Sequence, residues 1–231
     1  MKLPSLLYPG TLVKRYKRFL ADVFLADGTM VTAHCPNSGS MRGCNLPGSP
    51  VLLSVADNIK RKYKHTWELI QVSGFWVGIN TGYPNKLVKE AIENGTIEEL
   101  QGYETILSEV PYGTNSRVDL LLKGKAGMCY VEVKNVTLVE NDMALFPDAV
   151  TTRGQKHLRE LAQMVTEGHR AVIFFVVQRP DGSAVAPADA IDPTYGRLLR
   201  QVSRHGVEPL AYRAVVSAQE IYLSNSLPVT L

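Results

Sequence analysis

The pattern of hydrophobic residues changes near residue 80, and this change restricts the chain to two kinds of structure in succession. Before it, short segments rich in Val, Leu, Phe and Trp alternate with Gly, Pro, Asn and Asp. Such segments are typical of strands joined by turns. After it, helical periodicity alternates with strand-like runs, which favours an α/β arrangement. We therefore expect an all-β unit over residues 1–80 and an α/β unit over residues 81–231.

The first unit is expected to be a small β-barrel. The coil over residues 35–50 is too rich in turn-forming residues to be regular, and it divides the strands. Many short strands within about 70 residues are typical of an OB-like or an SH3-like barrel. The expected strands cover residues 11–19, 20–27, 28–35, 49–57, 65–73 and 75–80.

The second unit is expected to be a mixed sheet flanked by helices. Pro84 begins a helical pattern that Gly95 ends. The continuous apolar run over residues 171–178 has the length of a strand that is covered on both faces. Further helices are expected over residues 153–167 and 193–204, and further strands over residues 104–110, 116–124, 127–136 and 210–216.

Composition excludes some classes of protein. No run approaches the ~18 consecutive apolar residues of a membrane span, so we expect no membrane segment. Cys35, Cys44 and Cys129 are widely spaced and form no C-x-x-C pair, so a zinc site is not expected. Three isolated cysteines fit free thiols in a reducing cytosol, and we expect a cytoplasmic protein.

Charge is distributed unevenly. Residues 1–80 carry 10 Lys or Arg against 4 Asp or Glu, whereas residues 81–231 carry 15 against 18. A basic first unit predicts a polyanionic partner, although a solvated basic surface would look the same.

The strand expected over residues 127–136 carries the strongest candidate site. Glu132 and Lys134 are two residues apart and therefore share one face of the strand, while Val131 and Val133 share the other. If Lys123 and Met128 pair across the intervening turn, Asp119 lies directly opposite Glu132. Directly opposed residues have Cβ atoms about 5 Å apart.

Two carboxylates at that separation repel each other unless a cation lies between them. Mg²⁺ prefers hard oxygen ligands and binds one or two carboxylates together with waters and phosphate oxygens. We therefore expect Asp119 and Glu132 to hold Mg²⁺ or Mn²⁺, with Lys134 beside them. The alternative is a pair of solvated cross-strand charges, because an acid-x-Lys triplet is common by chance.

The same residues carry a resemblance. Asp119 followed by Glu132-x-Lys134 on the adjoining strand is similar to the PD-(D/E)xK nuclease arrangement, with valine in place of the proline before Asp119. The segments PYGTNSRVDLLL, YVEVKNVTL, FPDAVTTRGQKHLREL and HCPNSGSM together resemble the sugar fermentation stimulation protein A family over essentially the whole chain.

This resemblance implies an N-terminal OB-like domain and a C-terminal restriction-endonuclease-like domain. It also implies DNA binding and a part in the regulation of sugar (maltose) use. In the nuclease mechanism that it implies, Asp119, Glu132 and Lys134 are catalytic. The metal polarises the scissile phosphate and activates water, and Lys134 stabilises the developing negative charge.

Other residues of the second unit are weaker candidates. Glu90 lies on the first helix, from which related nucleases bring an acid to the metal, but it could equally be a solvated glutamate near Lys86. Arg117 shares a face with Asp119 and could contact phosphate or brace the carboxylate. Near the start of the next helix, Gln155, Lys156 and His157 suit a phosphate, although His157 could be structural.

Two basic clusters in the first unit are candidate nucleic-acid contacts, because cations interleaved with aromatic residues bind phosphates and stack on bases. The coil that includes His34 and Asn37 could fold over the cleft between the units. The clusters are Lys14, Arg15, Lys17 and Arg18 around Tyr16, and Lys60, Arg61, Lys62 and Lys64 around Tyr63.

Two functional hypotheses follow. One is a DNA-binding protein with a metal-dependent nuclease site, acting without strong sequence specificity. The other is a DNA-binding regulator on a nuclease-like scaffold that does not cleave. A sugar-processing enzyme has little support in the sequence, and the oligomeric state is open.

Neutralising Lys60, Arg61, Lys62 and Lys64 together to alanine is expected to weaken DNA binding. Each lost phosphate contact lowers the slope of log Kd against log salt by about 0.9 on duplex DNA. Fluorescence anisotropy at several salt concentrations measures both quantities. An unchanged affinity with an unchanged slope would refute this role.

Overall fold

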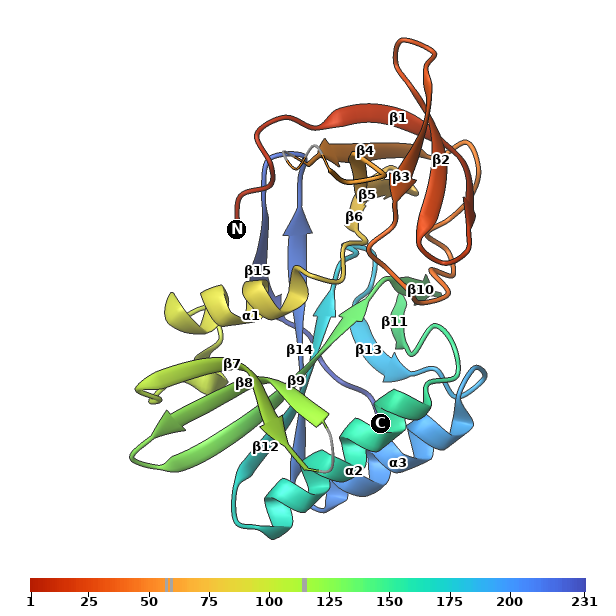
Figure 1. Ribbon diagram of the computed structural model, residues 1–231. Coiled ribbons are helices and arrows are strands. Elements are labelled where there is room, and N and C mark those ends of the chain that lie inside the picture. Colours follow the sequence, from red (N-terminus) through yellow and green to blue (C-terminus); the bar gives the residue numbers. More distant parts are fainter. Residues whose placement is uncertain (57, 59, 114–115) are drawn as a thin grey trace.

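The computed structural model describes residues 1–56, 58, 60–113 and 116–231. Its first part is a sheet in the order β3-β2-β1-β4-β5-β6, which a parallel contact between His34 and Thr66 closes into a five-stranded barrel. Figure 1 shows this barrel above the rest of the chain. The strands are β1 (Tyr8–Tyr16), β2 (Leu20–Leu25), β3 (Met30–His34), β4 (Pro50–Val55), β5 (His65–Val72) and β6 (Phe75–Gly78).

Six strands were expected here and the described residues form six. Five lie within their expected bounds, whereas β1 begins at Tyr8, before the expected residue 11. The strand expected to reach Phe19 ends at Tyr16, because Lys17 and Arg18 have positive φ angles of 49° and 63° and turn the chain into β2. Asp57, included in the strand expected over residues 49–57, lies outside the described residues. The barrel encloses its own core around Trp67, Leu12 and Leu53.

The second part is a mixed sheet in the order β15-β14-β12-β9-β8-β7. Strand β12 runs parallel to both β9 and β14, whereas the outer pairs are antiparallel. The strands are β7 (Thr105–Tyr112), β8 (Ser116–Gly124), β9 (Gly127–Val136), β12 (Arg170–Val177), β14 (Val207–Val216) and β15 (Ile221–Ser226).

A small third sheet, in the order β10-β11-β13, was not expected from the sequence. Its strands have only three or four residues, too few to show a hydrophobic period. They are β10 (Leu138–Glu140), β11 (Met143–Phe146) and β13 (Ala184–Pro187).

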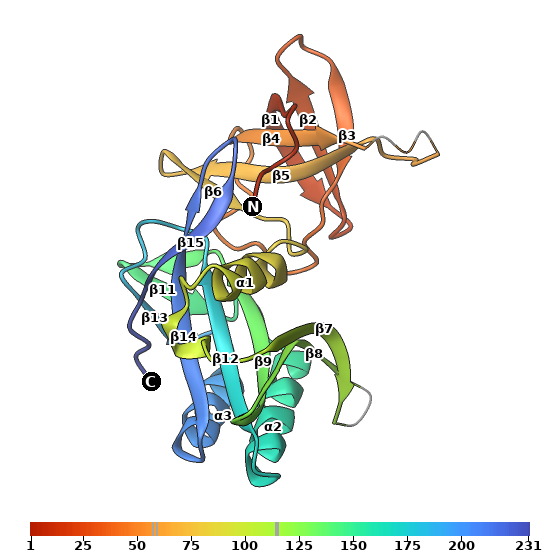
Figure 2. The same ribbon diagram turned by 90° about the vertical axis from the view of Figure 1, so that its left-hand side faces the viewer.

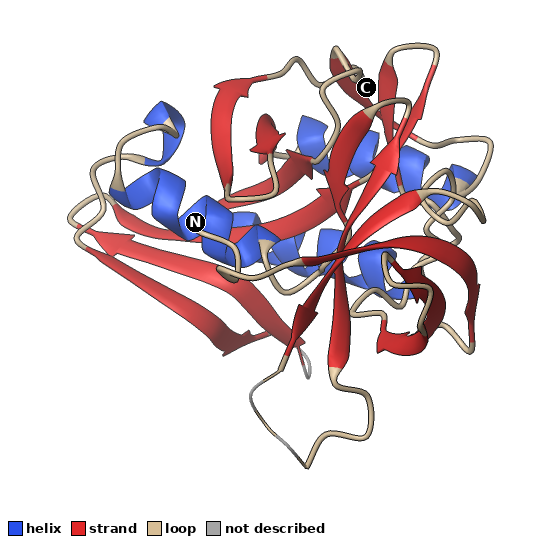
Figure 3. Ribbon diagram, turned by 90° about the horizontal axis from the view of Figure 1, so that it is seen from above, coloured by secondary structure: helices blue, strands red, loops and turns tan. Residues whose placement is uncertain are grey.

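Helices cover both faces of the mixed sheet (Figure 2). Side chains of β12 alternate between the faces, with Phe174 on the side of α1 (Pro84–Glu93) and Phe175 on the side of α2 (Thr152–Thr166) and α3 (Pro193–Arg204). Burial on both faces explains the continuous apolar run of β12. The barrel part consists of strands and loops, and the α-helices of the described residues lie in the second part (Figure 3). The expected OB-like barrel followed by a mixed sheet flanked by helices is therefore confirmed.

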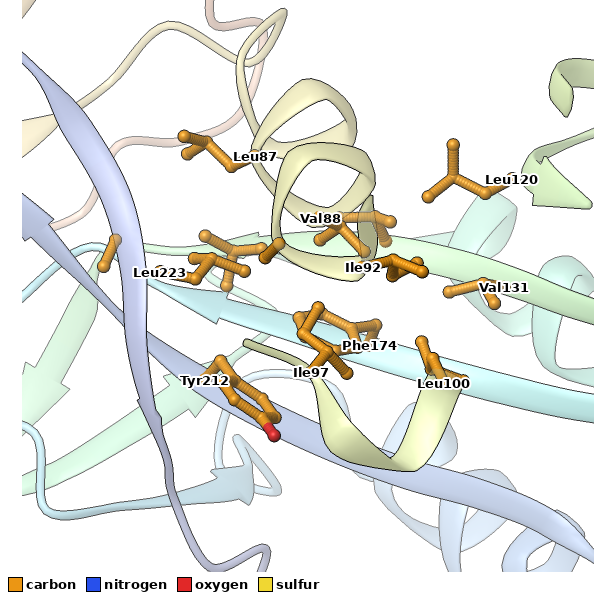
Figure 4. Close-up of a cluster of buried hydrophobic side chains, with 14 of the residues drawn as sticks. Leu87, Val88, Ile92, Ile97, Leu100, Leu120, Val131, Phe174, Tyr212 and Leu223 are labelled. Atoms are coloured by element: carbon orange, nitrogen blue, oxygen red, sulfur yellow. The ribbon is translucent and has the colours of Figure 1, made fainter. Parts of the chain in front are cut away.

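One core cluster joins the two parts. Leu52 of β4 and Leu69 of β5 are buried in the same cluster as Leu87 of α1 and Phe174 of β12. Figure 4 shows α1 and the short 3-10 helix η1 (Glu98–Leu100) packed on the sheet at this cluster. Burial of apolar surface is favourable in proportion to the area buried, so this shared cluster holds the barrel against the sheet.

Asp192 connects the N-termini of the two helices on the other face. Its carboxylate is buried and caps α3 by accepting a hydrogen bond from the Tyr195 N–H at 2.9 Å. It also accepts hydrogen bonds from the Thr151 N–H, at 2.9 Å, and from Nε2 of Gln155, at 3.1 Å, at the start of α2. A single side chain therefore aligns both helices.

Cys35, Cys44 and Cys129 are free and buried. Among the helices of the described ranges, none is long and apolar enough to cross a membrane.

Replacing Asp192 with alanine is expected to destabilise the fold by about 3 kcal/mol, because it removes a helix cap and leaves buried donors unpaired. Asp189→Ala is the matched control: its half-exposed ion pair with Arg200 is expected to be worth less than about 1 kcal/mol. Denaturant unfolding measures both variants. Equal losses would contradict the role of Asp192.

The contribution of Asp192 should depend on pH. Burial acts to raise the pKa of Asp192, but the hydrogen bonds from Thr151, Tyr195 and Gln155 outweigh it and hold the pKa below its usual 3.8. A carboxyl whose folded pKa is depressed contributes stability above the unfolded pKa and loses it as pH falls through the folded pKa. The difference between wild type and Asp192→Ala should therefore be constant near neutral pH and shrink below about pH 4.

Candidate active site

The β8–β9 hairpin opens at Asp119. Its ladder runs from Gly124 paired with Gly127 to Leu120 paired with Val131, which is the register expected from the sequence. At the next position, Oδ2 of Asp119 accepts a hydrogen bond from the Val133 N–H at 2.7 Å. A side chain thus replaces the backbone of β8 as the partner of β9.

Asp119 is also held from α1. Nδ2 of Asn85, in the first turn of that helix, donates to Oδ1 of Asp119 at 2.8 Å and to Oε1 of Glu109 at 3.3 Å. Asn85 therefore ties the helix that follows the barrel to the carboxylate on β8.

Glu132 lies at the centre of a buried polar group. Its side chain is 2% exposed, and Oε1 accepts a hydrogen bond from Nζ of Lys134 at 2.5 Å and a short one from Nδ1 of His157 on α2. Nε2 of His157 accepts from Nε of Arg153 at 3.3 Å, which assigns the proton of a neutral imidazole to Nδ1. Oε2 of Glu132 is buried without a hydrogen-bond partner among the described residues.

The surroundings act differently on the two carboxylates. Burial acts to raise the pKa of Glu132, but the Lys134 ammonium and the hydrogen bond from His157 outweigh it, so the pKa lies below its usual value. For Asp119, burial and the charge of Glu132 raise the pKa above its usual value. The pKa values of the two carboxyls are therefore shifted in opposite directions.

Asp119, Glu132 and Lys134 line one cleft of about 430 Å³ between the barrel and the mixed sheet. The barrel contributes Asn37, Ser38 and Gly39 to its wall. The expected cluster of two acids and one lysine on one side of the sheet is therefore present in the structure.

The cleft offers a divalent cation carboxylate oxygens, but only a few of them. Oε2 of Glu132 is a buried oxygen without a hydrogen-bond partner among the described residues, and Asp119 lines the same cleft. No group of three or more His, Cys, Asp and Glu side chains is arranged for a metal within the described residues. A cation here would take two carboxylates and complete its shell with water and substrate oxygens, as is usual for Mg²⁺.

Comparison with known proteins agrees with this architecture. Residues 82–220 match the family described as "Sugar fermentation stimulation protein RE domain", and residues 13–79 match "SfsA N-terminal OB domain". The chain belongs to the sugar fermentation stimulation protein family. The resemblance noted in the sequence is therefore confirmed.

Relatives of this family cover the chain from end to end. The sugar fermentation stimulation protein homolog of Geobacter metallireducens is 68% identical over 232 residues, covering 100% of both chains. That of Geobacter sulfurreducens is 69% identical over 229 residues, covering 99% of this chain and 98% of its own. The structure of Pyrococcus furiosus SfsA in complex with Ca²⁺ aligns over 100% of both chains with a TM-score of 0.90 and 28% identity.

Two residues expected at the site have other partners in this family member. The carboxylate of Glu90 accepts a hydrogen bond from the amino group of Met1 at 2.8 Å and is not part of the cleft wall, so the structure does not bring it to the metal candidates. The side-chain amide of Gln155 donates to Asp192 and therefore holds α2 against α3.

Arg15 is held by contacts within the chain, and its expected contact with nucleic acid stays a prediction. Its guanidinium donates to four backbone oxygens, three of them at 2.8–2.9 Å and the fourth at 3.3 Å. This hydrogen bonding is a reason to regard Arg15 as an organiser of the loop that walls the cleft. The four acceptors belong to Arg18, Asn37, Gly39 and Ser40.

The same loop crosses to the second part of the chain. Oγ of Ser40 donates to the backbone oxygen of Asp148 at 2.7 Å, and the Met41 N–H donates to Oδ2 of Asp148 at 2.8 Å. Residues 37–41 therefore do close over the cleft, and Asn37 orders the turn by accepting from the Gly39 N–H at 2.8 Å. His34 is not part of the cleft wall.

The remaining basic residues lie at the surface of the barrel. Lys14 is 63% exposed, lies 3.7 Å from Asp22 and stacks over the Tyr16 ring at 5.4 Å. Lys17 and Arg18 occupy the β1–β2 turn, and Lys60, Lys62 and Lys64 occupy the β4–β5 loop together with Arg61, which donates to Thr66 at 3.3 Å. Their role in nucleic-acid binding stays a prediction.

Asn85, Arg153 and Asp148 were not singled out from the sequence. Each is polar and follows a proline or threonine near the start of a helix or loop, which is common and carries no signal for a site. The partners of Asn85 and Asp148 lie 34 and 107 positions away, so only the tertiary fold reveals them. The partner of Arg153 is His157, one turn further along the same helix.

Arg15→Ala is expected to loosen residues 37–41. Hydrogen bonds to a charged donor are worth about 1.5–3 kcal/mol, so amide hydrogen exchange in this loop should accelerate about tenfold or more. Lys14→Ala, an exposed neighbour on the same strand, serves as the control and should leave the exchange unchanged. If Arg15 contacts phosphate instead, its removal would leave exchange unaltered while lowering DNA affinity.

Proposed function

We propose that this protein binds DNA and hydrolyses phosphodiester bonds in the cleft with the help of a divalent cation. The observation that carries the proposal is the buried, unpartnered Oε2 of Glu132 in a cleft that Asp119 and Lys134 also line. A buried carboxylate oxygen without a donor is costly unless a ligand satisfies it.

Asp119 and Glu132 would hold the cation, Mg²⁺ or Mn²⁺, which supplies Lewis-acid polarisation of the phosphate and activation of water. Lys134 is anchored on Oε1 of Glu132, so its ammonium stays beside the cation ligands. There it can neutralise charge that develops on the phosphoryl oxygens. His157 holds Glu132 from α2 through the same oxygen, which leaves Oε2 directed to a ligand.

Two further features support this function. The P. furiosus relative was solved in complex with Ca²⁺, another hard cation that prefers oxygen ligands. The barrel carries an excess of cations over acids, and Lys14 and Lys62 lie over tyrosine rings at its surface, at 5.4 Å and 5.5 Å. Such a surface suits a polyanion with sequence-independent contacts.

A second candidate function is DNA-bound regulation of sugar use without cleavage. The observation that favours it is that both oxygens of Asp119 already accept hydrogen bonds and that Glu132 is already paired with Lys134 and His157. This charge balance stabilises the site without a metal.

Incubation with plasmid DNA and oligonucleotides in Mg²⁺ or Mn²⁺, compared with EDTA, tests the choice. Cleavage is expected with metal and should fall by about 10²–10³ in Asp119→Ala and in Lys134→Ala, which remove a cation ligand and a charge-stabilising donor. Lys123→Ala is the matched control, since it is an exposed lysine at the other end of the same hairpin.

The two candidates give different results. If no tested substrate is cut in either metal while DNA binding persists in wild type and in the Asp119 and Lys134 variants, regulation without cleavage is the better description. If cleavage survives both substitutions, the assignment of this cleft is wrong.

A further inference from the structure

A second hollow of about 610 Å³ adjoins the cleft. Glu109, Arg153 and His157 line both, so the two border each other at these residues. The hollow extends from them along β7, β8 and the first turns of α2, where Arg117 and Lys156 complete its charged wall.

The two spaces have opposite charge. The cleft is lined by four carboxylates, those of Glu109, Asp119, Glu132 and Asp148, against two cations. The hollow is lined by three cations against one carboxylate, counting the described residues. An acidic space that suits a metal therefore lies beside a basic space that suits an anion.

Contacts with described residues hold two of the three cations in place. Nη1 of Arg117 donates to the backbone oxygen of Glu109 at 3.0 Å, and Nε of Arg153 donates to His157 at 3.3 Å. Each contact uses one of the five N–H donors of a guanidinium and orients the others. Lys156 lies 3.5 Å from Glu160.

Glu109 marks the junction between the spaces. It has a φ of 55°, a left-handed conformation that is uncommon for a residue with a side chain in a strand. Its backbone oxygen holds Arg117, while Oε1 accepts from the same Asn85 amide that holds Asp119. One residue therefore links the basic hollow to the metal candidates.

We propose that the hollow is a phosphate subsite for a nucleic-acid strand whose neighbouring phosphodiester lies in the cleft. The identity of that neighbouring bond rests on the proposed function, whereas anion binding in the hollow does not. The carboxylates of the cleft repel a phosphate, so a strand needs cations beside them to be held. The substrate is accordingly an oligonucleotide strand with at least two consecutive phosphates.

The walls suggest how the strand lies. Residues 37–39 and Asp148 line the cleft but not the hollow. The hydrogen bonds from Ser40 and Met41 to Asp148 connect the barrel to the second part of the chain there. The strand therefore leaves the cleft at the shared residues Glu109, Arg153 and His157, and passes into the hollow.

Binding of a fluorescein-labelled oligothymidylate of about ten nucleotides tests the subsite without any need for hydrolysis. The triple variant Arg117→Ala/Arg153→Ala/Lys156→Ala should bind about tenfold more weakly at low salt. Its slope of log Kd against log salt should fall by about 0.7 for each phosphate that the hollow neutralises. Anisotropy is measured in EDTA and again in Ca²⁺.

Competition by short ligands locates the effect. Wild type should bind the dinucleotide pdTpdT more tightly than thymidine 5′-monophosphate. This gain in affinity from the second phosphate should vanish in the triple variant. The double variant Arg117→Ala/Lys156→Ala keeps the contact between Arg153 and His157, and should lose most of the gain. Thermal unfolding confirms that each variant folds.

Arg159→Ala is the matched control, because Arg159 is an exposed arginine of α2 that lines neither space. A triple variant with unchanged affinity and slope, or an Arg159→Ala loss as large, overturns the subsite even if Asp119-dependent cleavage is present. If the triple variant loses binding and the wild-type protein cleaves no substrate in any metal, the subsite is supported and the proposed hydrolysis is rejected.

Discussion

The structure of the cleft depends on the hydrogen bond between the Asp119 carboxylate and the Val133 N–H. It occupies the position where the β8–β9 ladder would otherwise continue, directly after Leu120 and Val131. Because a buried N–H must be paired, this bond lets β8 diverge from β9 without loss of a partner. β9 remains paired with β12 on its other edge as far as Val136, so the acids stand on a rigid support.

Hydrogen bonds to the two carboxylates explain how charged groups are tolerated so close to an apolar core. Unpaired charge in such an environment is costly, and truncation of one partner of a buried pair costs more than the pair contributes. Lys134 and His157 both pair with one oxygen of Glu132, and Asn85 pairs with Asp119. Of the four oxygens of Asp119 and Glu132, Oε2 of Glu132 is buried without a hydrogen-bond partner among the described residues, and it therefore carries the functional argument.

Local patterns predicted the fold well and the site in part. The GKAG turn fixed the register that brings Asp119 and Glu132 to one side, and the apolar run of β12 predicted cover on both faces, because these effects act within a strand or hairpin. Arg15, Gln155 and Glu90 have the chemistry of phosphate or metal contacts. Their partners, at carbonyls, at Asp192 and at the Met1 amino group, lie up to 89 positions away and only the fold brings them together.

Two of the connections between the barrel and the second part of the chain lead to the cleft. Leu52 and Leu69 share a core cluster with residues of α1, whose Asn85 holds Asp119. Arg15 orders the loop that bonds to Asp148 ahead of α2. A shift of the barrel would therefore disturb Asp119 through α1. Through the loop bonded to Asp148, it would also disturb the start of α2, which carries Arg153 and His157. Cations on the barrel surface consequently have a fixed geometry relative to the site, so a nucleic acid held by them would meet the cleft in a defined orientation.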